Sequence, residues 1–406
     1  MATGAAQTLL GELADIGRDP RSGGYRRHAW DDADMQLREW FVGAAQARGL
    51  QTDEDGNGNL FARWTPGPGG SGDDAVLIGS HLDSVPDGGA FDGPLGVVSS
   101  FAAIDRLRAE GFAPARPVVV ACFADEEGAR FGIACAGSQL ATGALDADRA
   151  LGLRDVDGQT LAEVMTARGR DPGAVGPTDL TRTVSTFVEL HVEQGRSLVH
   201  SGDAVGVATA IWPHGRWRLD FCGAADHAGA TEMADRRDPM TTYAAAVLAA
   251  RRLATEHGAR ATFGRLSVEP GATNAIPSRV RAWLDARAAD EPTLQRLVDS
   301  LVTDARRTGA EDGTEVVLTT ESQSPAVTFD GPLRERLAGL LDAPVLPTAA
   351  GHDAGVLAPH VPTAMLFVRN PTGVSHSPAE HADAADCTAG VAALTDVVRD
   401  LAGGPT

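Results

Sequence analysis

The chain has 406 residues and a formal net charge of −20, with 35 Lys and Arg against 55 Asp and Glu. This length predicts two domains and at least one large core. The excess of negative charge argues against a nucleic-acid partner, because phosphate binding needs a basic surface. No apolar run approaches the roughly 20 residues that a membrane helix needs. We therefore expect a globular protein with neither a nucleic-acid nor a membrane partner.

The N-terminus and the cysteines bear on the compartment. Residues 1–19 lack a basic start followed by a long apolar core, so they do not have the pattern of a signal peptide. The four cysteines are scattered and form no CxxC pair. Three of them lie in apolar or small-residue surroundings, which is typical of reduced thiols in a protein core. These features predict a cytoplasmic protein.

The first regular element is predicted at residues 32–48. Apolar residues from Leu37 to Ala44 recur at the spacing of one helical face, and Gly49 follows as a stop signal. The segment 65–74 is too rich in Gly and Pro for a helix or a strand, and it predicts a surface loop.

Three short apolar runs follow, and each ends in polar residues that can bind a ligand. Continuous β-branched runs with helix-like stretches between them predict buried strands of a mainly parallel α/β sheet. Such sheets bind ligands beyond the carboxyl ends of their strands. The runs and the polar residues after them are 76–78 with His81, 118–123 with Glu126 and Glu127, and 187–190 with His191.

The pattern changes between about Val207 and Thr320, where apolar and polar residues alternate. Strands near 217–221, 261–268, 280–286 and 315–319 and helices at 239–255 and 292–308 are predicted there. Their order, β-α-β-β-α-β, is the ferredoxin-like arrangement. A helix near 333–341 and a strand at 363–368 then resume the first pattern. We predict an α/β protein whose parallel-sheet domain, 1–206 and 323–406, carries an inserted α+β domain, 207–322.

Five residues at the predicted sheet edge and in nearby loops form a candidate metal set. All five offer nitrogen or oxygen, which suits zinc, manganese or cobalt. A single catalytic zinc usually takes three protein ligands, so two ions that share one bridging carboxylate fit the count better. Asp83 lies two residues after His81 and can receive the second N–H of that imidazole. The five residues are His81, Asp92, Glu127, His191 and His376.

Each part of this set also has a structural interpretation. A lone HxD pattern is more often a capped turn, a Glu-Glu pair is more often a solvated helix start, and His191 alone would be a core histidine. The order of the residues and their positions at strand ends favour a metal site over these separate interpretations.

The sequence resembles the amidase/hydantoinase/carbamoylase family of two-metal amidohydrolases. This family includes allantoate amidohydrolase and N-carbamoyl-L-amino acid hydrolase, and it is related to aminoacylase and carboxypeptidase-G metallopeptidases. The matching stretches run in family order across nearly the whole chain: GSHLDSVPDGGAFDGPLGV, DEEGARFG, ELHVEQG, DHAGATEMADRRD, GATNAIPSRV, LDAR, GHDAG and GVSHSPAEH.

The resemblance implies a role for each of these residues and a di-metal catalytic domain with an inserted dimerisation, or lid, domain. Asp92 would bridge two divalent ions, with His81 and His191 on one and Glu127 and His376 on the other. Glu126 would be the general base, and we count Asp83 among the catalytic residues for its expected hydrogen bond with His81. His227 would reach the site of the partner subunit and hold the oxyanion. The residues implied to line the substrate pocket are Gln194, Asn274, Arg287 and Gly351, with Asn274 and Arg287 gripping a carboxylate.

Several assignments stay open at this point. His381 competes with His376 as the last ligand, and we favour His376 because its Ser-His-Ser-Pro context matches the family. His352 is a weaker ligand candidate that we expect in the pocket wall. Arg369 could bind a second substrate carboxylate or form a salt bridge at the rim.

The predicted reaction is hydrolysis of a linear amide or ureido C–N bond in a small carboxylate substrate. The two ions would lower the pKa of a bridging water, and Glu126 would accept its proton. Allantoate or an N-carbamoyl-L-amino acid is the favoured substrate. The alternatives are an N-formyl or N-formimidoyl amino acid such as a glutamate derivative, ureidoglycolate, and an aminoacylase or peptidase substrate. A non-catalytic metal-dependent binding protein is the alternative of a different class.

Overall fold

A computed structural model describes residues 4–66 and 74–403. The chain divides into two compact units, one of Met1–Ala210 with Thr328–Thr406 and one of Ile211–Val327. The predicted limits of the inserted domain, 207 and 322, lie a few residues earlier in the chain, because strands cross both of them. Most of the predicted 65–74 loop, residues 67–73, lies outside the described residues.

The first unit contains a nine-stranded sheet in the order β1-β2-β4-β3-β5-β15-β6-β13, with β14 paired to β6. The central strands β4, β3, β5 and β15 run parallel, whereas β2 and β6 pair antiparallel with this group. The strands are β1 (Gln51–Glu54), β2 (Leu60–Trp64), β3 (Ala75–His81), β4 (Val118–Phe123), β5 (Val184–Val192), β6 (Val205–Ile211), β13 (Val327–Thr328), β14 (Val345–Thr348) and β15 (Thr363–Val368).

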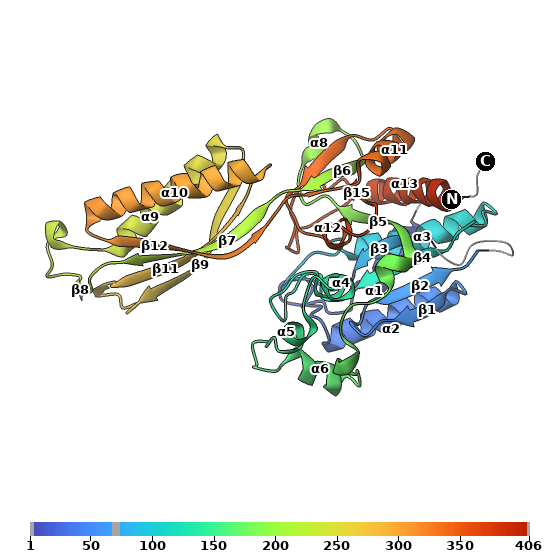
Figure 1. Cartoon of the computed structure of the whole chain (residues 1–406), viewed down its shortest axis with the longest axis horizontal. Helices are drawn as coiled ribbons and strands as arrows, with labels where there is room; N and C mark the ends of the chain where they lie inside the picture. The colour runs from blue at the N-terminus through green and yellow to red at the C-terminus, as the bar shows by residue number, and fades with distance from the viewer. Residues whose placement is uncertain (1–3, 67–73, 404–406) are drawn as a thin grey trace. The chain divides into compact units, whose positions relative to one another are not determined.

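Helices cover both faces of this sheet (Figure 1). The apolar core of one face joins the sheet to α1, α2, α3 and α13, and α4 and α12 pack on the other side. The central strands β3, β4 and β15 are buried along their whole length, as the continuous apolar runs predict. The helices of this unit are α1 (Ala5–Leu13), α2 (Asp32–Ala47), α3 (Pro94–Ala109), α4 (Ala136–Thr142), α5 (Ala147–Leu151), α6 (Leu161–Ala167), α7 (Leu180–Thr183), α8 (Ser197–Ser201), α11 (Gly331–Leu341), α12 (Asp353–Leu357) and α13 (Ala384–Ala402), with a 3₁₀ turn at Pro172–Ala174.

The register of the parallel strands brings the predicted reactive residues to one edge. His81 pairs with Phe123, so the Glu126–Glu127 turn begins just beyond the strand end that carries His81. Gly79 pairs with Glu189, which places His81 level with His191 on the next strand. The prediction that these residues share the carboxyl edge of the sheet is therefore confirmed.

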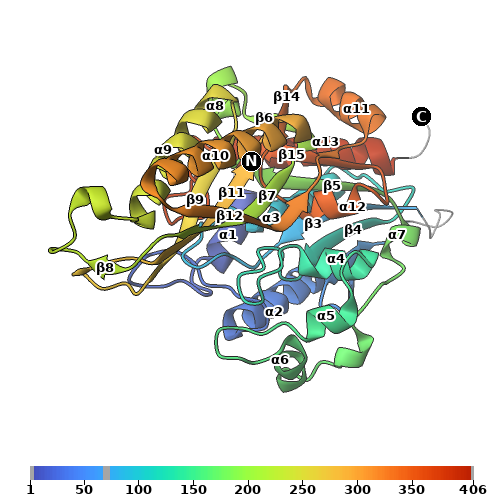
Figure 2. The ribbon, with the colours of Figure 1, turned by 60° about the vertical axis from the view of Figure 1, so that its left-hand side comes forward.

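The second unit is an antiparallel four-stranded sheet in the order β12-β7-β11-β9, with α9 and α10 packed against it (Figure 2). The chain order of these elements confirms the ferredoxin-like prediction. The same unit contains a separate two-stranded ribbon, in which β8 pairs with β10. The elements are β7 (His214–Cys222), β8 (Asp226–His227), a 3₁₀ turn (Met233–Asp235), α9 (Pro239–Glu256), β9 (Arg260–Glu269), β10 (Ala275–Ile276), β11 (Arg279–Arg287), α10 (Glu291–Asp312) and β12 (Glu315–Ser324).

Local sequence signals explain where the long helices begin. The side chains of Asp31, Asp238, Asp290 and Asp330 each accept a hydrogen bond from a backbone N–H in the first turn of α2, α9, α10 and α11. Proline lies in the first turn of the last three, where its missing N–H costs nothing. Among the described residues, no helix is long and apolar enough to cross a membrane.

Candidate metal centre

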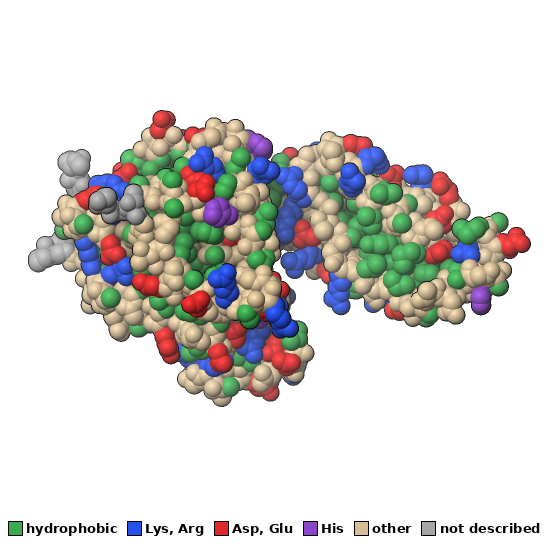
Figure 3. All heavy atoms as spheres, turned by 180° about the vertical axis from the view of Figure 1, so that it is seen from behind, with side chains coloured by type: hydrophobic (Ala, Val, Ile, Leu, Met, Phe, Trp, Pro, Cys, Tyr) green, Lys and Arg blue, Asp and Glu red, His purple; other side chains and the backbone are tan. Residues whose placement is uncertain are grey.

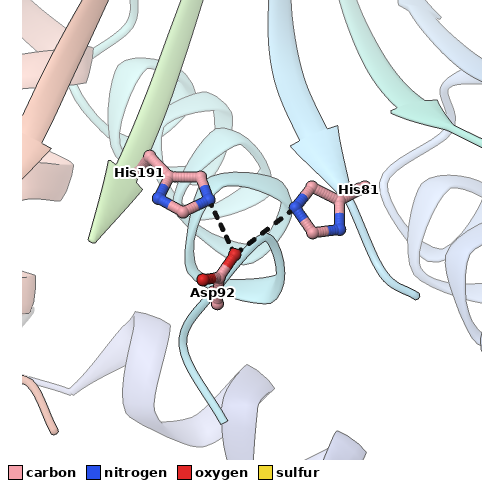
Figure 4. A group of neighbouring side chains, drawn as sticks. All are labelled: His81, Asp92 and His191. Carbon is pink, nitrogen blue, oxygen red and sulfur yellow. Dashed lines mark ion pairs between the residues drawn. The ribbon is translucent and has the colours of Figure 1, made fainter. Parts of the chain in front are cut away.

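Two buried histidines from neighbouring strands point at one buried aspartate (Figure 4). His81 ends β3 and His191 lies near the end of β5, whereas Asp92 lies in the glycine-rich loop before α3. The Nε2 atom of His191 is 3.1 Å from Asp92 Oδ1, and that of His81 is 3.6 Å from the same oxygen. The three side chains therefore offer two nitrogens and an oxygen to one position, as a metal ion requires.

The second nitrogen of each imidazole is held by a backbone carbonyl. His81 Nδ1 lies 3.1 Å from the carbonyl oxygen of Asp83, and His191 Nδ1 lies 2.8 Å from that of Val192. Each Nδ1–H therefore donates to the backbone and directs Nε2 toward Asp92, which is the usual orientation of a metal-binding histidine. Nε2 of His81 is buried and has no hydrogen-bond partner in the part of the chain that the structure describes.

Asp92, Glu127 and His376 form a second group beside the first. His376 Nε2 is 3.4 Å from Glu127 Oε2 and 3.7 Å from Asp92 Oδ2. The two Asp92 oxygens therefore face different groups, as a bridging carboxylate would. His376 has a positive φ of 55° and a half-exposed side chain, so this group opens toward solvent.

The competing histidine, His381, lies outside both groups. Its Nε2 is 3.1 Å from Asp383 Oδ1, and its ring contacts the ring of Phe91 edge-on. The geometry therefore favours His376 over His381 as the last ligand.

Asp83 organises the turn that carries Glu126 and Glu127. Its two carboxylate oxygens accept the N–H groups of Glu126 and Glu127 at 3.2 and 3.0 Å. The sequence predicted that Asp83 would accept the N–H of His81, and its backbone carbonyl does so, while its carboxylate lies 3.5 Å away. The buried Glu126 carboxylate lies 3.6 Å from His81 Nε2 and accepts a hydrogen bond from the thiol of Cys135.

The ionisation of the cluster is strongly displaced. Burial, opposed by His81 and reinforced by Glu127, raises the pKa of Glu126 well above its ordinary value. Burial and the charge of Asp92 raise the pKa of Glu127 to about 8. Burial disfavours protonation of His191, but Asp92 outweighs it and raises the pKa of that imidazole to about 9. Large displacements of the pKa values of neighbouring ionisable groups are typical of functional sites.

These observations test whether the residues suit divalent cations. The donors are imidazole nitrogens and carboxylate oxygens, and the buried Nε2 of His81 has no hydrogen-bond partner among the described residues. With Asp83 and Glu126 included, four acids face three histidines in the cluster. A cation at this position would supply the positive charge that the buried acids otherwise draw from protons. The set therefore fits one ion at each of the two groups.

A buried network behind His191 was not predicted from the sequence. Glu189 accepts hydrogen bonds from the Ser80 hydroxyl at 2.7 Å and from the Ala354 N–H at 2.9 Å. The ring of His352 packs edge-on against His191, with centroids 4.5 Å apart. Glu189 and His352 could form a ligand group with His191, but both Glu189 oxygens already have donors, so we assign the pair to support of His191. Glu189 stands two residues before His191, and that period-two spacing was the available signal.

The loop residues expected near the substrate lie around Asp92 or close to His352. The Gln194 Nε2–H₂ group donates to Asp92 Oδ2 at 2.9 Å, and the Ser375 hydroxyl, which the sequence did not single out, donates to the same oxygen at 2.8 Å. Gly351 is exposed just before α12, where added side-chain volume would meet nothing within 4 Å. His352 is buried against His191, and its place in a pocket wall stays a prediction.

Three predicted residues belong to the second unit, which brings two of them together and keeps the third apart. His227 and Asn274 are exposed and adjoin each other, because His227 pairs with Ala275 across the β8–β10 ribbon. Arg287 ends β11, whereas Asn274 lies before its start. The eight residue steps of β11 alone span about 26 Å. One copy of this unit therefore cannot place Asn274 and Arg287 on the same small carboxylate.

The hydrogen bonds that His227 and Arg287 make within the chain determine how each side chain could bind a substrate. His227 Nδ1 accepts the N–H groups of Gly229 and Ala230, both at 3.1 Å, so the proton lies on the exposed Nε2. Arg287 donates to both oxygens of Asp285, at 2.9 and 3.2 Å.

Arg369 forms a salt bridge within the first unit. Its guanidinium donates to both oxygens of Asp386, at 2.8 and 2.7 Å. The salt-bridge interpretation of Arg369 thus matches the structure.

Comparisons with known proteins agree with this architecture. Residues 77–400 match the sequence model of peptidase family M20/M25/M40. The chain is 38% identical to an N-carbamoyl-L-amino acid amidohydrolase of Geobacillus stearothermophilus, over 97% of each protein. It is 32% identical to the allantoate amidohydrolase of Escherichia coli, over 98% of each. A solved amidase of the hydantoinase/carbamoylase family from Burkholderia multivorans superposes with a TM-score of 0.87 at 31% identity, covering 99% of this chain and 98% of that one.

Proposed function

Because the chain belongs to peptidase family M20/M25/M40, we propose that it is a two-metal hydrolase of an amide or ureido C–N bond in a small carboxylate. The observation that carries this proposal is the position of Asp92 between two groups of metal-ligand type, His81–His191 and Glu127–His376. Zinc, manganese and cobalt all suit these donors.

Glu126 is the proposed general base. Divalent ions held at the two groups would polarise the scissile carbonyl and make an attacking water more acidic. The Glu126 carboxylate is buried beside His81, and the turn that carries it is fixed by Asp83. From there it can accept the proton of the attacking water and deliver it to the leaving nitrogen. A protein that only binds a ligand has no use for this base.

His227 is the proposed donor to the oxyanion of the tetrahedral intermediate. Its protonated Nε2 is exposed, and two backbone N–H groups fix the ring by holding Nδ1. Preorganised donors of this kind stabilise a transition state by about 3 kcal/mol. Arg287 is the proposed partner of the substrate carboxylate, because its planar guanidinium can form two parallel hydrogen bonds.

A homodimer formed through the second unit is supported by two features. His227 and Asn274 lie near the start of β11, whereas Arg287 ends this strand. Two copies of the chain are therefore needed for all three residues to serve one site. The edge strand β9 is ten residues long, and Leu266 on β9 and Leu248 on α9 are exposed. Figure 3 shows hydrophobic side chains gathered on one face of this unit. An unpaired edge strand and an exposed apolar patch are features that association can cover.

An N-carbamoyl-L-amino acid is the proposed substrate, because the 38% identical relative bears that activity in its name. Allantoate is the second candidate, on the basis of the 32% identical relative. Both compounds carry a ureido carbon and a carboxylate. The four cysteines are free, which fits the cytoplasm as the proposed location.

The test is ammonia release from a panel of N-carbamoyl-L-amino acids, allantoate and ureidoglycolate, and formate release from N-formyl amino acids, with Mn²⁺ or Zn²⁺ added. We expect turnover of a ureido substrate that a chelator abolishes and metal restores. We also expect Glu126→Gln to keep its metal and fold but to lose at least a hundredfold in kcat, about the contribution of a general base. Normal turnover by Glu126→Gln would refute the base, and binding of every compound without turnover would favour a binding protein.

A further inference from the structure

Glu380 contacts the backbone of the loop that carries Asp92, although it lies nearly three hundred residues further along the chain. Its Oε1 accepts the N–H of Phe91 at 2.8 Å and that of Asp92 at 2.9 Å. The side chain is 5% exposed, and a Cβ added at Gly89 would lie 2.3 Å from its carboxyl carbon. The carboxylate therefore packs directly on the glycine-rich loop and satisfies two adjacent amides of it.

Glu380 lies four residues after His376, on the same loop, whereas its two hydrogen-bond donors lie on the loop of Asp92. The two amides therefore join the loop of His376 to the loop of Asp92. Ser375 adds a second link, since its hydroxyl donates to Asp92 Oδ2.

The two groups differ in how firmly their ligands are held. His81 and His191 are fully buried on strands of the sheet, which fix them through the ladder. His376 is half exposed on a loop, so the position of the Asp92–Glu127–His376 group depends on contacts of that loop. Glu380 supplies one such contact, and this contact is buried.

We propose that Glu380 is a positioning residue that joins the two ligand loops and thereby sets the affinity of the Asp92–Glu127–His376 group for its ion. The proposal rests on the two-metal function given above. It adds a residue whose loss would free the loop of His376, whereas His81 and His191 stay fixed on their strands. Glu380 acts through backbone amides, so an acceptor oxygen is what it must provide.

The test compares metal binding by three full-length variants with the wild type. Each protein is stripped with a chelator and equilibrated with Zn²⁺ or Mn²⁺ at buffered free concentrations, and bound metal is counted by mass spectrometry. Glu380→Ala removes the acceptor. Glu380→Gln keeps an oxygen for both amides and places its N–H₂ where Oε2 now has no hydrogen-bond partner. Asp31→Ala is the matched control, because Asp31 also accepts two backbone N–H groups, of His28 and Asp34.

We expect Glu380→Ala to bind its second ion at least about tenfold more weakly, the usual effect of losing a residue that supports a ligand. The first ion should keep its affinity. Glu380→Gln should bind both ions within a few-fold of the wild type, and Asp31→Ala should bind them unchanged. At saturating metal the kcat of Glu380→Ala should recover with little change in KM.

Wild-type affinity for both ions in Glu380→Ala would overturn the proposal, and so would equal weakening of both ions or weakening in Glu380→Gln equal to that in Glu380→Ala. A wild type that binds fewer than two ions would instead contradict the proposed function itself. If Glu380→Ala does not fold, Glu380→Asp replaces it, since its shorter side chain cannot reach the amides, and the same outcomes apply.

Discussion

At the scale of single residues, Asp83 occupies a position where both carboxylate oxygens and the backbone carbonyl are needed as acceptors. Both carboxylate oxygens accept a backbone N–H from the turn of Glu126 and Glu127, and its carbonyl accepts from His81. An asparagine there would present N–H₂ to one of the amides and leave a buried donor unpaired, at a cost of about 1–3 kcal/mol.

We therefore predict that Asp83→Asn lowers kcat/KM by about tenfold or more and also lowers the melting temperature. Steady-state kinetics and thermal unfolding measure the two effects. Asp105→Asn is the control, because Asp105 makes a surface ion pair with Arg48 whose loss should change stability by under about 1 kcal/mol. Wild-type kinetics in Asp83→Asn would show that the two amides need no carboxylate.

The residues of the site differ in how far the sequence could predict them. His81 and His191 end apolar runs, so their strand positions were visible in the chain. Glu380 was visible as part of the SHSPAE stretch, but its partners were not, because Phe91 lies far away in sequence and contributes a backbone N–H. Contacts between distant loops depend on the tertiary fold, and residue type carries no signal for them.

At the scale of elements, the start of α3 shows how the backbone shapes the site. Gly93 precedes this helix with φ of 82°, a conformation that L side chains rarely adopt. A Cβ at this position would lie 2.4 Å from Cε1 of His81, so the loop passes directly against the imidazole. Glycine is required there both for its backbone freedom and for its lack of a side chain.

We predict that Gly93→Ala loses more stability than Gly111→Ala and also loses metal. Gly111 follows the same helix with φ of 75°, but a Cβ there would meet nothing within 4 Å. Gly111→Ala should therefore show only the backbone strain of about 1–2 kcal/mol. Denaturant unfolding and metal content measure both variants, and equal losses in the two would contradict the close approach to His81.

Several of the elements that the sequence predicted have a regular pattern, although α13, with 19 residues, was not predicted. The strand at 363–368 and the helices near 239–255 and 292–308 were found because their apolar residues repeat over many positions. The short helices between Ala136 and Ser201 were not predicted, because four to seven residues give too few repeats to reveal a face. The two-residue strands β8 and β10 are shorter still, and only the pairing in the folded chain defines them.

At the scale of the whole molecule, the account predicts that each active site needs two copies of the chain. Glu126→Gln and His227→Ala should each be inactive alone. Mixed in equal amounts and allowed to exchange subunits, they should recover about a quarter of wild-type activity, because half of the dimers would carry one intact site. Ammonia release before and after mixing is the measurement.

The control is a mixture of His227→Ala with Asn274→Ala. The two residues adjoin each other on the β8–β10 ribbon and would enter the same site, so this mixture should stay inactive. Recovery in the control, or no recovery in the first mixture, would count against a site shared in this way.

The central claim is that Asp92 holds two divalent ions, and anomalous diffraction from crystals grown with Mn²⁺ tests it most directly. The account predicts two peaks flanking Asp92, one beside His81 and His191 and the other beside Glu127 and His376. A single peak, or peaks away from Asp92, would contradict it.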